Sequence, residues 1–166
     1  MRKWSLFVLP LVTAAVMVGC QQNERQAEGP GVNLADLEPV QIVETASGQQ
    51  AQAVSEAAAE PIVLIRDEAD LQAMGLEELP VEADLAEQDV VLATMGEQDT
   101  GGYWVRIDGI QRLGNTLYVQ ATFNAPAEDA TTTQALTYPF AAAVIPNVEG
   151  DVTVSPDIEQ VRGQSQ

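Results

Sequence analysis

Two runs of alternating apolar and polar residues constrain the fold of this chain more than any other feature. They cover residues 103–107 and 117–123, and in each run the odd-numbered residues are the more apolar. A period of two is typical of strands with one buried and one exposed face. The sequence Leu113-Gly114-Asn115-Thr116 lies between the runs and supplies turn residues. The two runs are therefore predicted to pair as an antiparallel hairpin.

Short apolar runs bounded by turn formers predict further strands at residues 40–43, 62–65, 90–93, 136–137, 142–145 and 152–154. One short helix is predicted near residues 67–75, where Asp67 is a candidate N-cap and Gly75 a candidate stop. The predicted fold class is α+β, dominated by antiparallel strands and hairpins, with this one short helix.

The N-terminus has the pattern of a targeting signal. Arg2 and Lys3 precede an apolar stretch that is too short for a membrane-spanning helix and fits a signal peptide over residues 1–19. The stretch ends in Met17-Val18-Gly19-Cys20, which resembles a bacterial lipobox. That resemblance implies that Cys20, the lone cysteine, carries palmitate-type acyl chains that anchor the mature protein. The alternatives are an ordinary secretory signal with an incidental cysteine, or a membrane anchor.

The remainder of the chain divides by composition. Residues 20–36 are predicted to hold the lipidated cysteine and a flexible spacer, residues 37–161 the folded domain, and residues 162–166 a polar tail. In Gram-negative lipoproteins an Asp after the acylated Cys usually signals retention in the inner membrane. The residue here is Gln21, so the expected location is the outer membrane, facing the periplasm.

Composition argues against several classes of protein. The chain has 25 Asp and Glu, 7 Lys and Arg and no His, for a net charge of −18. Such an acidic chain is a poor ligand for nucleic acids, and contact with the membrane is expected only through the lipid anchor. Loss of residues 1–19 would leave five arginines and no lysine against the same 25 acids, a net charge of −20. Without His, Lys or a free thiol, we predict no catalytic residues and no cofactor.

The segment from Gly96 to Trp104 is the strongest candidate for a binding site, because two glycines stand beside two large aromatic residues. The predicted partner-binding residues are Thr100, Gly101, Gly102, Tyr103, Trp104 and Arg106. From the alternation we expect Tyr103 to be buried and Trp104 to be exposed beside Arg106, as an anchor for a protein partner. The alternative is a structural turn whose glycines are required only by backbone geometry.

Two separated motifs resemble the PrcB C-terminal domain family. The first is Asp89-Val90-Val91-Leu92-Ala93 followed by Gly96 and Thr100-Gly101-Gly102-Tyr103, and the second is Thr133-Gln134-Ala135-Leu136-Thr137-Tyr138-Pro139-Phe140. In the namesake of that family, a lipoprotein assembles with a secreted subtilisin-like protease and supports its stability. The resemblance implies a non-enzymatic lipoprotein of the cell envelope that binds a protein, with a secreted protease as the expected partner.

Two weaker patterns give alternatives. The Thr100–Trp104 segment is similar to a loop of chagasin-type cysteine-protease inhibitors, although the other loops of that class are missing, so a protease inhibitor acting through this loop is the alternative function. Two acidic clusters invite a calcium interpretation: Asp67, Glu68 and Asp70 in one, and Glu82, Asp84, Glu87 and Asp89 in the other. Neither has EF-hand spacing, and a solvated acidic face explains them equally, so no metal site is predicted.

Overall fold

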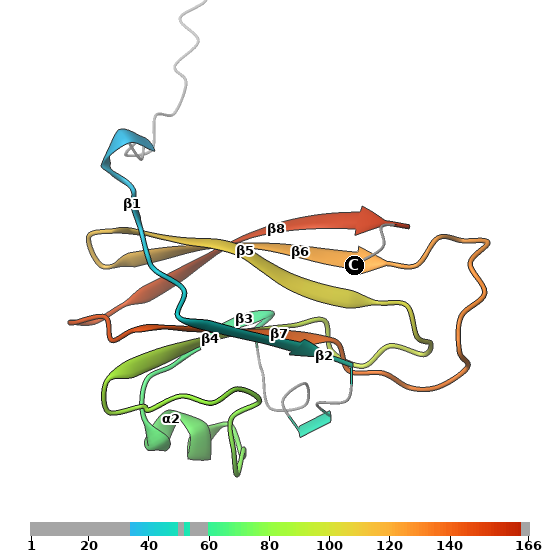
Figure 1. Cartoon of the computed structure of the whole chain (residues 1–166), viewed down its shortest axis with the longest axis horizontal. Helices are drawn as coiled ribbons and strands as arrows, with labels where there is room; N and C mark the ends of the chain where they lie inside the picture. Colours follow the sequence, from blue (N-terminus) through green and yellow to red (C-terminus); the bar gives the residue numbers. More distant parts are fainter. Residues whose placement is uncertain (1–33, 50–51, 54–59, 164–166) are drawn as a thin grey trace, which may run out of the picture. The chain divides into compact units, whose positions relative to one another are not determined.

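The computed structural model describes residues 34–49, 52–53 and 60–163, which form two four-stranded sheets (Figure 1). The predicted signal peptide, Cys20 and most of the spacer lie outside these residues. The strands of sheet A, in spatial order, are β1 (Glu38–Pro39), β5 (Trp104–Leu113), β6 (Thr116–Ala125) and β8 (Thr153–Arg162). Those of sheet B are β2 (Glu44–Gly48), β7 (Phe140–Pro146), β4 (Gln88–Thr94) and β3 (Ile62–Ile65). A 3₁₀ turn, η1 (Leu34–Asp36), precedes β1.

The two central strands of sheet B, β4 and β7, are buried on both faces, and this explains their continuous apolar sequences. Successive residues of β4 alternate between two cores: Val91 faces sheet A, and Leu92 faces the opposite side. The core between the sheets consists of Ile62, Val91, Ala93, Val105, Ile107, Ile110, Leu117, Val119, Ala121, Phe123, Ala141, Ala143, Ile145 and Val148. The second core consists of Ile65, Leu76, Val81, Val90, Leu92, Phe140, Ala142 and Val144.

The second core is covered by helix α2 (Glu68–Ala73) and by the segment that follows it (Figure 1). The Asp67 carboxylate accepts a hydrogen bond from the Asp70 backbone N–H at 2.9 Å, so Asp67 is the N-cap that the sequence predicts. Gly75 has φ +72°, which ends the helix as expected. Leu71 and Met74 pack against the second core from a half-buried position. Among the described residues, no helix is long and apolar enough to cross a bilayer.

The predicted hairpin is present. Strands β5 and β6 pair antiparallel across a turn at Gly114 and Asn115, and the odd-numbered residues from Val105 to Ile107 and from Leu117 to Phe123 face the core. A β-bulge at Asp108 shifts the register between Ile107 and Gly109. The β-dominated fold class with mainly antiparallel strands and a short helix at 67–75 is confirmed.

Three details of the predicted strands are wrong. Residues 40–43 are not a strand but the link between β1 of sheet A and β2 of sheet B, and their N–H groups at Val40 and Val43 bond to one sheet each. Residues 136–137 form only an isolated bridge, in which Thr137 pairs with Gln98. Strand β8 is much longer than residues 152–154, and it runs parallel to β6 because the chain crosses over from sheet B after β7.

Candidate partner-binding site

The two motifs that carry the family resemblance lie against each other. The Gly101 N–H donates to the Thr133 carbonyl at 3.0 Å, and the Thr137 hydroxyl donates to the Thr100 carbonyl at 2.8 Å. Gln98 and Thr137 exchange two backbone hydrogen bonds of 2.8 and 2.9 Å. The turn before β5 is therefore held by the segment before β7, about 30 residues later in the chain.

The two glycines are needed for different reasons. Gly102 has φ +91°, a conformation that L-residues rarely adopt. Gly101 does not have a positive φ, but a Cβ there would lie 2.3 Å from the Thr133 hydroxyl oxygen. Close approach of the two segments requires the first glycine, and the backbone angle requires the second. Both requirements are structural.

The expected exposure of the two aromatic residues is wrong. Trp104 is 6% exposed, whereas Tyr103 is half-buried. At this end of sheet A the outer face is also covered, since Trp104 pairs with Asn124, which is 1% exposed. The alternation continues along β5, but here it no longer separates buried residues from exposed ones. Trp104 is therefore a packed residue and not an exposed anchor.

Gly102 and Arg106 are the exposed members of the predicted set, and Arg106 is the one that presents a side chain. Its guanidinium carbon lies 5.4 Å from the centroid of the Trp104 ring, within the range of a cation–π contact. Its Nε donates to Asp108 Oδ1 at 2.5 Å, and the Thr122 hydroxyl donates to Asp108 Oδ2 at 2.5 Å. The β-bulge at Asp108 places this carboxylate between the two donors. The Arg106 side chain is 55% exposed, so its cationic group is held in place yet accessible.

A shallow groove of about 380 Å³ lies beside this arginine on the outer face of sheet A. Its lining residues are Arg106, Asp108, Gln120, Ala121, Thr122, Asp157 and Glu159. Four of the six predicted partner-binding residues form the turn before β5 that is docked on the segment before β7, here called the docked turn: Thr100, Gly101, Gly102 and Tyr103. Of the six, only Arg106 lines this groove.

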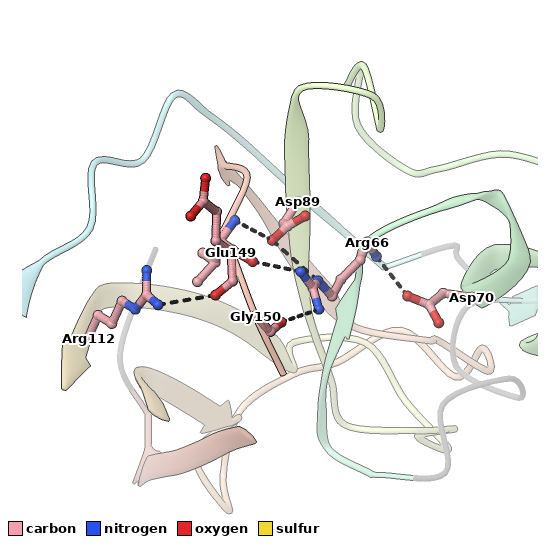
Figure 2. A network of polar contacts seen from close by, with 7 residues as sticks. Arg66, Asp70, Asp89, Arg112, Glu149 and Gly150 are labelled. Carbon is pink, nitrogen blue, oxygen red and sulfur yellow. Dashed lines mark hydrogen bonds and ion pairs between the residues drawn. The ribbon is translucent and has the colours of Figure 1, made fainter. Parts of the chain in front are cut away.

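A second polar cluster was missed by the sequence analysis (Figure 2). Asp89, at the start of β4, is 0% exposed, and its Oδ2 accepts the Val148 N–H at 2.9 Å. Arg66 follows β3, and its Nε lies 3.8 Å from the same oxygen. Its two terminal nitrogens donate to the carbonyls of Val148 at 2.6 Å and of Gly150 at 2.8 Å.

This cluster binds the backbone of the segment that crosses from one sheet to the other. Residues 147–152 lead from β7 of sheet B to β8 of sheet A. Arg112, at the end of β5, donates to the Glu149 carbonyl at 3.2 Å, so three consecutive carbonyls of the crossover accept hydrogen bonds from two arginines (Figure 2). The cluster has a structural role in positioning β8.

Burial raises the pKa of Asp89 above its ordinary value of 3.8. The hydrogen bond from Val148 and the charge of Arg66 act in the opposite direction, and the charge of Asp70 adds to the increase. Asp89 Oδ1 and Arg66 Nε have no hydrogen-bond partner among the described residues, so the ion pair compensates burial only in part.

A sequence signal for this pair exists. Arg66 comes directly after the apolar run 62–65, and Asp89 directly before the run 90–93. Ile65 pairs with Val90 in antiparallel register, which places the next residue of one strand opposite the preceding residue of the other. If the pairing of the two apolar runs had been recognised in the sequence, it would have predicted the contact between Arg66 and Asp89.

The two acidic clusters do not form a metal site. Asp67, Glu68, Glu82 and Asp84 line one groove beside α2, whereas Asp89 is buried in the cluster of Figure 2. Among residues 34–49, 52–53 and 60–163, no group of three or more His, Cys, Asp or Glu side chains is placed to hold a metal ion.

Comparison with known proteins gives one positive finding. No curated protein and no solved structure shows a significant match to this chain. Residues 90–146 match the family model described as PrcB C-terminal, and this match confirms the resemblance seen in the sequence. The matched range contains most of β4, all of β5 to β7 and both motifs except Asp89.

Proposed function

We propose that this chain is a lipid-anchored protein of the cell envelope whose β-sandwich binds a protein partner and catalyses no reaction. The match to the PrcB C-terminal family supports this proposal, together with the lipobox-like sequence that ends in Cys20. The expected partner is a secreted protease, held near the outer membrane and stabilised in its folded form. A ligand that binds only the native state adds about 2.7 kcal/mol of stability at 100 times its Kd.

The observation that carries the binding proposal is the fixed position of Arg106. Its contact with Trp104 and its hydrogen bond to Asp108 order the side chain before any partner arrives. An ordered side chain loses less conformational entropy on binding. Arginine and tryptophan are the residue types most enriched at binding hot spots, and here the buried tryptophan supports the exposed arginine. Asp157 and Glu159 on the same groove would favour basic groups of the partner around this anchor.

The inhibitor alternative has less support. It requires a Thr100–Trp104 loop that can enter the active site of a protease. Gly101 is packed against Thr133, and Trp104 is 6% exposed, so neither is free to project. The turn is held by hydrogen bonds to Thr133 and Thr137, which fits a structural turn better than an inserting loop.

Crosslinking and affinity purification from envelopes of the native host test the proposal. The wild-type chain should recover a protease, and Arg106→Gln should lower its recovery by about tenfold or more, the effect expected of a hot spot. Arg162→Gln is the matched control, because Arg162 is another exposed arginine in an ion pair, with Glu128, and its loss should not change recovery. Cys20→Ala should move the intact complex to the soluble fraction.

Two results would contradict the proposal. Equal recovery with Arg106→Gln and wild type would remove Arg106 from the interface. Loss of protease activity when purified wild-type chain is added would replace the tethering function by inhibition.

A further inference from the structure

A groove of about 710 Å³ lies between α2 and the segment that follows it, on the far side of sheet B from sheet A. This volume is within the range of pockets that bind ligands. Its lining residues are Asp67, Glu68, Leu71, Glu78, Leu79, Val81, Glu82, Ala83, Asp84, Leu85 and Ala86.

The floor of the groove is apolar. Leu71 comes from α2, and Leu79 and Leu85 come from the segment that follows. All three are half-buried: they pack against the second core on one side and line the groove on the other. Half-exposed leucines gathered in one groove are a typical surface for a partner's apolar side chains.

The rim of the groove is acidic throughout. It carries five carboxylates and no basic residue. Asp67 and Asp84 each accept a backbone hydrogen bond inside the chain, from Asp70 and Ala86. Within the described residues, no hydrogen bond or ion pair engages the carboxylates of Glu68, Glu78 or Glu82, all of which are exposed. The charge of the rim therefore selects for cations.

We propose that this groove binds a peptide segment of a partner protein in which apolar side chains alternate with lysine or arginine. The apolar side chains would cover the three leucines, and the cations would pair with the carboxylates of the rim. A second copy of this chain is a poor occupant, since each copy carries a net charge of −18. The inference is independent of the proposed function, because the groove and Arg106 lie on opposite outer faces of the sandwich.

Fluorescence anisotropy with a labelled peptide of alternating leucine and lysine tests this inference. The full folded domain should bind the peptide at low salt and more weakly at high salt. Glu78→Gln/Glu82→Gln should weaken binding about threefold or more, since exposed ion pairs are individually weak. Both residues are exposed, so the neutral isosteres leave the fold intact.

The matched control is Glu38→Gln/Glu44→Gln, which makes the same change in net charge on exposed positions of β1 and β2. It should bind like wild type. A peptide with serine in place of leucine should bind more weakly to wild type, because it cannot cover the floor.

Three results would overturn the inference. Equal loss of binding in the two double variants would mean that the peptide responds only to net charge. Equal binding of the serine peptide would remove the apolar floor from the interaction. Unchanged binding in Glu78→Gln/Glu82→Gln would place the peptide elsewhere. None of these results bears on whether Arg106 recruits a protease.

Discussion

The chain contains two arginine–aspartate pairs in opposite environments. Arg106 and Asp108 lie on the outer face of sheet A, 55% and 32% exposed, with 2.5 Å between Nε and Oδ1. Arg66 and Asp89 lie where the chain crosses between the sheets, 34% and 0% exposed, with 3.8 Å between Nε and Oδ2. The closer contact is the exposed one, although the buried pair is the one that bonds to the backbone of the crossover.

The difference shows that distance alone does not rank such pairs. The exposed pair is largely solvated, and its charges cost little to separate. In the buried pair, Asp89 has lost its water and keeps one backbone hydrogen bond, so its remaining stabilisation comes from Arg66. The same two residue types hold an exposed guanidinium in place in one region and hold the crossover segment in the other.

The largest effect is expected from removal of the buried cation. Arg66→Met leaves the Asp89 carboxylate buried without its counter-charge and removes both donors to the Val148 and Gly150 carbonyls. We expect the free energy of unfolding to fall by about 3 kcal/mol, in the range for a broken buried pair. The midpoint of urea denaturation at neutral pH measures it.

Arg106→Met is the control for that measurement. It removes the same group from the exposed pair and should cost about 1 kcal/mol or less. Similar costs for the two variants would mean that burial does not distinguish the pairs and that the comparison between them is wrong.

Sequence reasoning identified the sheet hairpin and the helix because local chemistry decides both. Residues 103–107 and 117–123 alternate and enclose their own turn, and Asp67 caps its helix through a contact within a few residues. Sequence reasoning failed where contacts between distant segments determine the structure. Burial of Trp104 depends on its place at a doubly covered end of sheet A, and the length and direction of β8 depend on a crossover that no local pattern encodes.

In the candidate site, too, some features follow from local residues and others from contacts between distant segments. The residue types alone drew attention to Gly101 and Gly102, whereas the structural need for each glycine follows from the backbone angle and from the docking of the segment before β7. The Arg66–Asp89 pair was overlooked because single charged residues beside strands are common and usually solvated.

An effect of intermediate size is expected at the turn that precedes Trp104, the residue that Arg106 packs over. Gly101→Ala places a Cβ against the Thr133 hydroxyl and should lower the free energy of unfolding by about 1–2 kcal/mol, the usual cost of overpacking. In Gly101→Ala/Thr133→Ala the clash is removed, so most of that loss should be recovered. Denaturation midpoints of both variants measure this, and no recovery in the double variant would show that the contact with Thr133 is not what requires the glycine.

The smallest effect is the pH dependence of the buried pair, and its sign tests whether burial or the ion pair dominates at Asp89. Burial raises the pKa of Asp89 above 3.8, so the folded chain holds this proton more tightly than the unfolded chain does. Asp89 therefore adds stability that is complete below about pH 3.8 and is lost as the pH rises through the raised pKa of the folded state. Asp89→Asn cannot ionise and keeps an acceptor for the Val148 N–H, so it does not lose this stability as the pH rises.

The free energy of unfolding of wild type minus that of Asp89→Asn should be largest in acid and should decrease as the pH rises. Urea midpoints of the two proteins at constant ionic strength measure that difference. If the difference instead grows with pH, the Arg66 charge outweighs desolvation, and the buried pair behaves like an ordinary stabilising salt bridge.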